Sequence, residues 1–410
     1  MENKFDLAVV GAGIIGLATA YKFQLKYPQL NIAIFDKAEA VSAHQTGRNS
    51  GVIHSGIYYK PGSFKSKNCV DGRHQMVAFA KKHGIKHDEC GKIILATTPE
   101  EVKLLENIYT RGQENGIEDI ELINPKAIHE IEPHVEGLKA IKVPVTGIID
   151  FTGVCKKLAQ LIQELNPKSQ LFLNTQVRGS ITGNGKNILQ TSKGDFEVGK
   201  KVFCAGLQAD RMAEMEGLKL DCAIVGFRGD YYELTDKAKH KVKHLIYPVP
   251  DPAFPFLGVH FTRMTDGSIE CGPNAVFSFK REGYSRTSFD LKDTVDALSF
   301  PGTRKLFAKH YQKGMEEYKR AFSKKLFLKA LQKMIPSLEM DDLQAARSGV
   351  RAQALLRNGN LVDDFQIEYG PDSVHVINAP SPAATAGLAI ADGIVERAES
   401  QFGWKEEILN

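Results

Sequence analysis

A glycine-rich turn near the N-terminus constrains what this 410-residue chain can fold into more than any other feature. An apolar run, residues 5–10, precedes the turn, and an apolar-periodic stretch, residues 17–25, follows it. This order predicts a strand, a tight turn and a helix. A second apolar run ends at Asp36 and completes a predicted βαβ unit.

The spacing of the three glycines and the acid suits a dinucleotide. Gly11 permits the turn, Gly13 lets the backbone approach a pyrophosphate, and Gly16 allows the helix to pack closely on the strand. The carboxylate of Asp36 can accept both ribose hydroxyls and would repel a 2′-phosphate, which disfavours NADP. The alternative is a glycine-rich turn without a ligand, and the unit alone does not separate FAD from NAD. The expected contacts are Gly11, Gly13, Ile14, Ile15, Gly16, Asp36 and Lys37.

The composition is that of an ordinary globular protein, with 42% hydrophobic and 25% charged residues. The length allows two domains, and a net charge of +4 is too small to indicate nucleic acid as a partner. The six cysteines form no C-x-x-C pair, so we expect reduced thiols and no bound metal. No apolar stretch approaches the roughly 20 residues that span a bilayer. Because the first apolar run leads directly into the turn, we expect no secretory signal and a cytoplasmic location.

Four further segments carry a family resemblance. Residues 45–59, QTGRNSGVIHSGIYY, combine small residues with a histidine and paired tyrosines, which suits a loop that wraps a flat ring system. This segment resembles the flavin-contacting segment of the D-amino-acid oxidase superfamily and, within it, of the L-2-hydroxyglutarate oxidase or dehydrogenase family. The similarity covers nearly the whole chain, and Arg48 stands where some members carry histidine. It continues through YPVPDPAFPFLGVHFTRMTDGSIECGPNAVFSFKREGY at 247–284, SGVRAQ at 348–353 and NAPSPAATAGLAI at 378–390.

The resemblance implies FAD as the cofactor and an α/β plus α+β fold. A Rossmann-like FAD-binding domain would be discontinuous, and a substrate domain would be built on an antiparallel sheet. The sequence supports this independently, because Asp150 can cap an amphipathic helix. Aromatic and β-branched residues also recur between 226 and 280, as in antiparallel strands. The expected FAD-binding segments are 1–87, 150–223 and 346–400, and those of the substrate domain are 88–149 and 224–345.

The same resemblance implies cofactor contacts beyond the glycine-rich turn. A buried strand that ends near Ala205 resembles the family's third cofactor strand, and the backbone of Val177 is expected beside the adenine. The small residues from 381 onward resemble the loop and helix start that close over the flavin pyrimidine, with a generic turn and helix cap as the alternative. The implied contacts are Thr46, Asn49, Ser50, Gly51, Val177, Ala205, Gly206, Gly349, Pro382, Ala383, Ala384 and Thr385.

Oxidation of a secondary alcohol by a flavin needs a base for the hydroxyl proton and a cation for a substrate carboxylate. Only His54 and His260, of the twelve histidines, lie in apolar, strand-like settings within the flavin-facing motifs. The superfamily implies contact with substrate for His54. A structural role is the alternative for both histidines, and which of them is the base stays open.

Anion-binding residues complete the expected catalytic site. Arg351 resembles the arginine that relatives such as glycerol-3-phosphate dehydrogenase use to hold an anionic substrate, and a surface ion pair is the alternative. A dicarboxylate needs a second cation, for which Lys280 is the candidate. Tyr59 and Ser381 are the remaining candidate substrate contacts.

Residues 304–333 form a basic segment with ten Lys or Arg and two acidic residues, so it carries +8 while the remainder carries −4. Apolar residues recur in it at steps of three or four, which predicts the apolar face of one helix or a helix pair. We favour helices packed on the substrate domain with a solvated basic face. The alternative is peripheral docking on anionic lipid at the inner face of the cytoplasmic membrane, which would suit quinone reduction. The apolar positions are Phe307, Tyr311, Met315, Tyr318, Phe322 and Leu326.

The expected activity is the FAD-dependent oxidation of L-2-hydroxyglutarate to 2-oxoglutarate, with electrons passed to quinone or oxygen. The first alternative is oxidation of another small anionic substrate, glycerol 3-phosphate or an amino acid, on the same fold. The second is a non-catalytic, membrane-associated flavoprotein. The residues do not determine the electron acceptor, the covalent attachment of the flavin or the oligomeric state.

Overall fold

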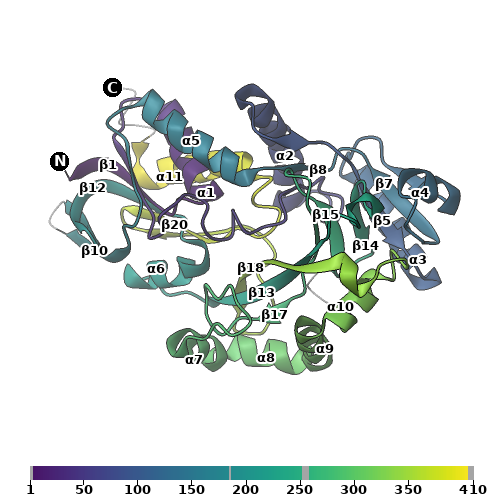
Figure 1. Cartoon of the computed structure of the whole chain (residues 1–410). Coiled ribbons are helices and arrows are strands. Elements are labelled where there is room, and N and C mark those ends of the chain that lie inside the picture. The colour runs from purple at the N-terminus through teal and green to yellow at the C-terminus, as the bar shows by residue number, and fades with distance from the viewer. Residues whose placement is uncertain (1–2, 184–185, 252–257, 405–410) are drawn as a thin grey trace.

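A computed structural model describes residues 3–183, 186–251 and 258–404. Part of the 247–284 motif, residues 252–257, therefore lies outside the described residues. Figure 1 shows two large sheets side by side, with helices α7 to α10 along the bottom of the view. Among the described residues the strands form an eight-stranded, a nine-stranded and a three-stranded sheet.

The eight-stranded sheet has a parallel centre, as the βαβ unit predicts. β1 pairs in parallel with β2 and β12, and β12 pairs in parallel with β20. Its apolar side chains alternate between two faces, so it buries two separate clusters. The strands are β1 (Lys4–Val10), β2 (Ile32–Phe35), β9 (Gln170–Phe172), β10 (Val177–Gly183), β11 (Lys186–Thr191), β12 (Gly194–Phe203), β19 (Gln366–Gly370) and β20 (Ser373–Asn378).

Helices far apart in the sequence cover one face of this sheet. The predicted cap of α5 is present, because an Oδ1 atom of Asp150 accepts a hydrogen bond of 2.9 Å from the backbone N of Gly153. Apolar residues of all four helices join the same core cluster, which binds the first and last parts of the chain together. The helices are α1 (Ile14–Lys26), α2 (Phe64–His83), α5 (Phe151–Leu165) and α11 (Gly387–Phe402).

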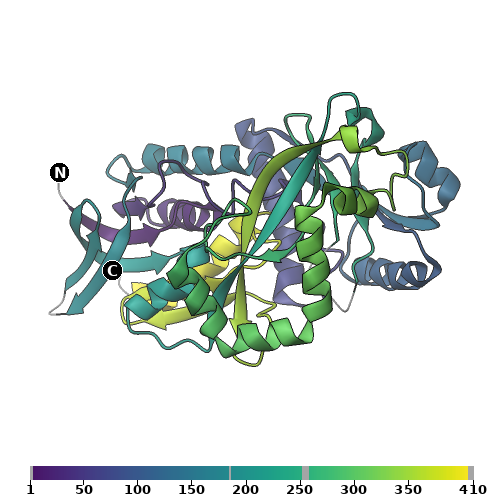
Figure 2. The same cartoon turned by 60° about the horizontal axis from the view of Figure 1, so that its bottom comes forward.

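The nine-stranded sheet is antiparallel except where β14 runs parallel to β5. Its long strands β13 and β18 pair along nearly their whole length and appear as two adjacent ribbons in Figure 2. The small third sheet contains β3 (Val52–Ile53), β4 (His87–Asp88) and β8 (Gly147–Ile149). The strands of the large one are β5 (Lys92–Ala96), β6 (Glu121–Ile123), β7 (Lys139–Val143), β13 (Cys222–Leu234), β14 (Leu245–Pro248), β15 (His260–Arg263), β16 (Ile269–Gly272), β17 (Val276–Phe277) and β18 (Leu343–Leu356).

The division of the chain into the two expected domains stays a prediction, and most strands of the two large sheets are compatible with it. Strands of the eight-stranded sheet all lie within the expected FAD-binding segments. Strand β18 belongs to the nine-stranded sheet and continues past residue 346, where the last FAD-binding segment was expected to begin. The remaining helices are α3 (Pro99–Glu114), α4 (Pro125–Ile131) and α6 (Ala209–Met215).

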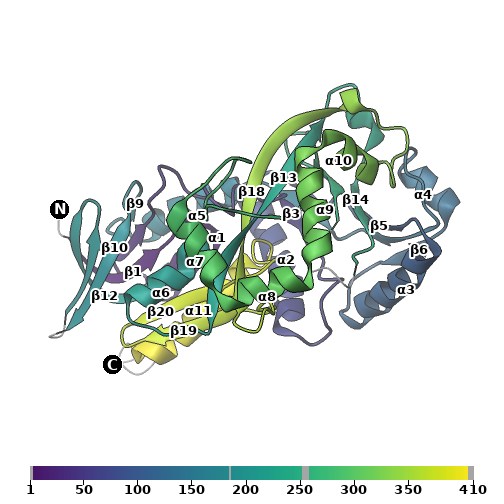
Figure 3. The same cartoon turned by 90° about the horizontal axis from the view of Figure 1, so that it is seen from below.

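The basic segment differs from its expected structure. It forms parts of three short helices, and in Figure 3, seen from below, these helices lie toward the viewer, in front of the nine-stranded sheet. The expected apolar face packs on the substrate domain only in part. Phe307 and Tyr318 lie against its core, whereas Tyr311 is 67% exposed and Phe322 is 63% exposed. The helices also pack through residues outside that face, Leu306, Phe327 and Leu331 among them. With α7 (Leu291–Ser299) before them, they are α8 (Pro301–Lys309), α9 (Tyr311–Phe322) and α10 (Lys324–Leu331).

Candidate functional site

A cavity of about 690 Å³ is lined by residues of both large sheets. Its volume is typical of small-molecule and cofactor sites. The glycine-rich turn and Asp36 line it together with His54, His260 and Arg351. The structure therefore brings the predicted nucleotide site and the predicted catalytic residues into a single site.

Most of the other predicted cofactor contacts also line this cavity, whereas four predicted residues lie outside its lining. Gly16 and Gly51 support the wall from behind, Tyr59 lies beside Ser381, and Lys280 is exposed. The predicted residues in the lining, besides those named above, are Gly11, Gly13, Ile14, Ile15, Lys37, Thr46, Asn49, Ser50, Val177, Ala205, Gly206, Gly349, Ser381, Pro382, Ala383, Ala384 and Thr385.

Close backbone approach explains the glycines of the turn. A Cβ atom on Gly16 would lie 1.9 Å from the carbonyl oxygen of Gly11, and one on Gly11 would lie 2.3 Å from that of Cys204. Gly11 also has a φ of +115°, which side chains disfavour. At the end of β2, the two carboxylate oxygens of Asp36 accept hydrogen bonds from the backbone N of Ala12 (2.7 Å) and of Ala38 (2.8 Å). These bonds fix the acid beside the start of α1.

The loop of residues 45–50 is held against β18 by side-chain hydrogen bonds and by backbone packing. Arg347 donates hydrogen bonds to the carbonyl oxygens of Gly47 (2.7 Å) and Asn49 (2.8 Å) and pairs with Glu270 of β16. A Cβ atom on Gly349 would lie 2.4 Å from the carbonyl oxygen of Arg48, so only glycine permits this approach. The loop therefore lies directly on the strand that carries Arg351.

The C-terminal small-residue run closes another wall. The hydroxyl of Thr385 is buried, accepts a hydrogen bond from the backbone N of His54 (3.1 Å) and donates one to the carbonyl oxygen of Val52 (3.1 Å). Burial raises the pKa of Tyr59, and a contact with the Ser381 hydroxyl opposes part of that shift. The segments that hold His54 and Ser381 are therefore joined, although they lie at opposite ends of the chain.

Both predicted histidines are uncharged at neutral pH. Burial lowers the pKa of His54 and of His260 to about 3. The Nδ1 atom of His260 lies 2.9 Å from the carbonyl oxygen of Gly258. Because a carbonyl oxygen can only accept, Nδ1 carries the proton and Nε2 keeps its lone pair. His260 therefore presents a neutral, oriented proton acceptor.

Arg351 and two tyrosines surround these histidines. Arg351 lies on β18 opposite Phe227 of β13, and its charge lowers the pKa of His260 further. Tyr231 and Tyr247 line the same cavity, and the ring of Tyr247 packs on that of His260 with 4.0 Å between centroids. Burial raises the pKa of Tyr231 to about 12, so its hydroxyl stays protonated. The site thus combines a cation with neutral hydrogen-bonding groups.

Sequence reasoning missed one cation of this region. Lys280 was expected to supply the second positive charge, but it is exposed and lies outside the cavity lining. Lys92 is only 2% exposed, and its charge lowers the pKa of both His54 and His260. A lysine at the start of an otherwise apolar strand, KIILA, was the signal that could have indicated it.

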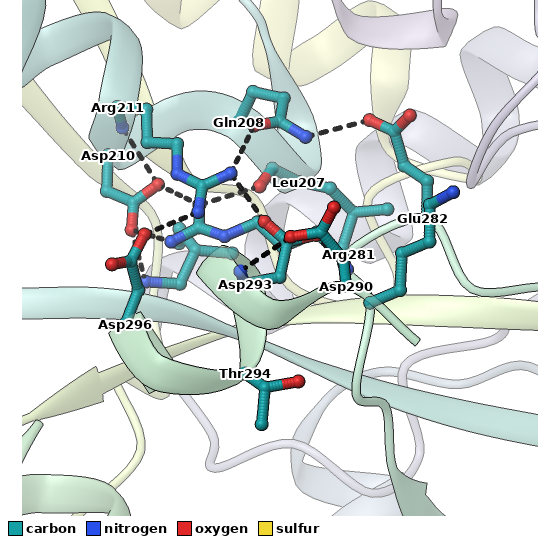
Figure 4. A network of polar contacts seen from close by, with 12 residues as sticks. Leu207, Gln208, Asp210, Arg211, Arg281, Glu282, Asp290, Asp293, Thr294 and Asp296 are labelled. Carbon is teal, nitrogen blue, oxygen red and sulfur yellow. Dashed lines mark hydrogen bonds and ion pairs between the residues drawn. The ribbon is translucent and has the colours of Figure 1, made fainter. Parts of the chain in front are cut away.

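A polar network joins the other end of the cavity to the substrate domain (Figure 4). Arg281 and Asp210 form a buried ion pair, and the Asp210 carboxylate also accepts from the backbone N of Ile224 (2.9 Å). Glu282 contacts Lys37 and accepts a hydrogen bond of 2.9 Å from Gln208. Arg211 pairs with Asp293 and Asp296 of α7. This network holds residues 281–296 across α6, next to the predicted adenosine site.

The residues of the cavity fit FAD. The glycine-rich turn leaves room at the N-terminus of α1, and the carboxylate of Asp36 faces the cavity beside it. The Nε2 atom of His44 is buried and has no hydrogen-bond partner among the described residues, although His44 lines the cavity. A ligand with polar atoms along its length would satisfy these groups.

The chain is similar over nearly its whole length to proteins named L-2-hydroxyglutarate dehydrogenase. It is 45% identical to the one from Indibacter alkaliphilus (97% of this chain, 100% of the relative). It is 41% identical to that of Escherichia coli K12 (97% and 93%) and 42% identical to the human mitochondrial protein (98% and 90%).

Solved structures and a family model agree with this similarity. The FAD-bound L-alpha-glycerophosphate oxidase from Mycoplasma pneumoniae is 25% identical, with a TM-score of 0.79 over 98% of this chain and 96% of that one. A glycine oxidase from Geobacillus kaustophilus shares the fold with a TM-score of 0.72 at 18% identity, covering 96% and 95%. The family model described as FAD dependent oxidoreductase matches residues 6–397. The chain therefore belongs to the FAD dependent oxidoreductases, and FAD is its cofactor.

Proposed function

We propose that this oxidoreductase converts L-2-hydroxyglutarate to 2-oxoglutarate. The observation that carries the proposal is the neutral His260, which keeps a lone pair on Nε2 and lines the cofactor cavity together with Arg351. Support comes from relatives that bear this activity in their names and match nearly the whole chain.

The roles of the residues follow from the chemistry of a secondary alcohol. Arg351 holds the carboxylate next to the reacting carbon with two parallel hydrogen bonds. The hydroxyl proton passes to Nε2 of His260, while the hydrogen on the same carbon leaves with its electron pair and a ketone forms. FAD supplies the two-electron acceptor for that hydride. His54 bounds the same space and orients the substrate.

Anaerobic bleaching of the flavin tests this substrate assignment. L-2-hydroxyglutarate is expected to remove the absorbance of the oxidised flavin, and 2-oxoglutarate is expected to accumulate in equal amount. The D enantiomer, which places the hydrogen on the other side of the carbon, serves as the control. An unbleached flavin with L-2-hydroxyglutarate would refute the proposal.

Oxidation of glycerol 3-phosphate is the second candidate. It is favoured by the likeness to the glycerophosphate oxidase, and an arginine binds phosphate as readily as carboxylate. Small amino acids are the third class to include in the same assay. If one of these compounds bleaches the flavin faster than L-2-hydroxyglutarate, that compound identifies the substrate.

We further propose quinone or oxygen as the electron acceptor, and peripheral contact of a cytoplasmic protein with anionic lipid. No helix of the described residues has the length and apolarity to cross a membrane. Exposed apolar side chains lie beside the lysines of α9 and α10, which suits an anionic membrane surface. Reoxidation of substrate-reduced enzyme by a soluble quinone and by oxygen, compared in stopped flow, distinguishes the two acceptors. The non-catalytic alternative is disfavoured by membership of an oxidoreductase family.

A further inference from the structure

A buried lysine, Lys92, lies outside the cavity lining but directly behind Tyr247, a lining residue at the histidine end of the cavity. Lys92 begins β5, and no carboxylate among the described residues forms an ion pair with it. Its ammonium instead lies over two aromatic rings, 4.7 Å from the centroid of Tyr58 and 5.0 Å from that of Tyr247. Burial of an ammonium without a counter-ion costs free energy, and cation–π contacts recover only part of it. Stability alone therefore does not explain Lys92.

The neighbours of Lys92 connect it to the site. His54, His260 and Tyr247 line the cavity, and the charge of Lys92 acts on both histidines. The hydroxyl of Tyr58 is buried without a hydrogen-bond partner among the described residues. A cation and an unsatisfied hydroxyl thus lie together beside the cavity. Both can donate hydrogen bonds to one anionic group.

We propose that Lys92 and the Tyr58 hydroxyl form an anion subsite that binds the substrate carboxylate farther from the reacting carbon. Arg351 binds the nearer carboxylate, so the two cations together select a dicarboxylate. The flexible stem of lysine lets the ammonium turn from the rings toward the ligand. This subsite rests on the proposed function in one respect, namely that the natural substrate is a 2-hydroxy dicarboxylate. Lys92 would thus supply the second positive charge that was expected from Lys280.

The surroundings of Lys92 make the subsite sensitive to pH. Burial lowers the pKa of Lys92 to about 7, while the histidines around it stay neutral and burial raises the pKa of Cys69 to about 12. A bound carboxylate would raise the pKa of Lys92 again, so binding takes up a proton above neutral pH. Affinity for a dicarboxylate should therefore fall as the pH rises through the pKa of the free lysine. The titratable groups that face Lys92 are Cys69 of α2, His54 and Tyr58 after β3, Tyr247 of β14 and His260 of β15.

Equilibrium binding of glutarate to the FAD-loaded protein tests the subsite without turnover. Glutarate lacks the hydroxyl group, and pentanoate matches its carbon count with a single carboxylate. Binding is followed by the perturbation of the flavin absorbance. At pH values above the pKa of the free lysine, the affinity of the wild type for glutarate should fall by up to about tenfold per pH unit. Lys92→Met should lower the affinity for glutarate by about 100-fold and leave the affinity for pentanoate unchanged.

Two further variants separate charge from structure. Lys92→Arg keeps the positive charge at all accessible pH values, so it should bind glutarate with no such pH dependence. Lys280→Met changes an exposed lysine outside the cavity lining and should behave as wild type. An equal loss of glutarate and pentanoate binding in Lys92→Met would overturn the subsite, as would glutarate binding that is independent of pH in wild type. The wild-type pH profile needs no variant to fold.

The subsite and the proposed function fail in different ways. If L-2-hydroxyglutarate does not bleach the flavin but glutarate binds with the expected pH profile, the substrate assignment fails and the anion subsite stands. If bleaching occurs but Lys92→Met binds glutarate as wild type does, the subsite fails and the substrate assignment stands.

Discussion

Single residues set how closely the backbone approaches the cofactor. Gly16→Ala places a methyl group where the carbonyl oxygen of Gly11 lies, because the added Cβ would be only 1.9 Å from it. We expect a purified variant with less than about a tenth of the wild-type flavin and a loss of about 1–3 kcal/mol in the free energy of unfolding. Flavin content per protein and urea unfolding measure these effects. Gly314→Ala on α9, where a Cβ meets no atom within 4 Å, is the control and should keep its flavin.

The two histidines should differ when each is replaced. His260→Asn removes the imidazole whose Nε2 keeps its lone pair, so we expect kcat to fall by about 10²–10⁴-fold. His54→Asn should chiefly raise KM, because His54 lines the substrate space without a fixed tautomer. Steady-state kinetics and flavin reduction in stopped flow separate the two effects. A larger loss of flavin reduction rate in His54→Asn would assign the base to His54 instead.

The charged residues show what local sequence can indicate. His54, His260 and Arg351 were predicted because they lie in apolar motifs of a recognised family, and the structure places all three at the cavity. Lys280 lies in the same family motif, yet its side chain is exposed. Whether a lysine faces solvent or a buried site depends on strands that pair from distant parts of the chain, as β14 does with Lys92 of β5. The spacing of residues within one segment does not predict which distant strands will pair with it.

Among the elements, α6 is joined through buried charge to the segment that precedes α7. Asp210→Asn leaves the guanidinium of Arg281 buried without its carboxylate, and Arg281 is only 7% exposed. We expect the free energy of unfolding to fall by about 3–5 kcal/mol. Chemical denaturation measures the change. Asp296→Asn removes a partly exposed partner of Arg211 and should cost less than about 1 kcal/mol, and equal losses in both variants would contradict the role given to the buried pair.

The helices of the basic segment explain why periodicity alone was insufficient there. Apolar residues spaced three or four positions apart predicted a single helical face. The chain turns at His310 and again at Ser323, so these residues are divided among α8, α9 and α10. Each short helix then packs through a different set of side chains. The βαβ unit was predictable because its strand, turn and helix are consecutive in the sequence.

On the scale of the whole molecule, the exposed apolar residues of α9 and α10 predict where a membrane would bind. The double variant Tyr311→Ser and Phe322→Ser removes two rings that are 67% and 63% exposed. We expect about tenfold weaker binding to vesicles that contain anionic lipid, with flavin content unchanged. Sedimentation with anionic and neutral vesicles at two salt concentrations measures it. Ile181→Ser on β10 is the matched control, and equal binding by all three proteins would exclude this surface.

The overall arrangement was predictable to the extent that the family was recognised. Recurring aromatic and β-branched residues predicted strands between 226 and 280, and the structure contains β13 to β17 there. Local pattern did not predict that residues 45–50 lie on β18, since their contacts with it span about 300 positions, as that of Arg347 with Gly47 does. Contacts of this length arise only when the two sheets have formed.

The walls of the cofactor cavity include residues from both Gly11 and Thr385, and β20 completes the parallel sheet beside β12. During translation, this enclosure cannot close before Thr385 has left the ribosome. We therefore expect FAD to bind only after β20 has joined the sheet, and a shortage of riboflavin would leave apoprotein with an unfilled cavity exposed to proteases.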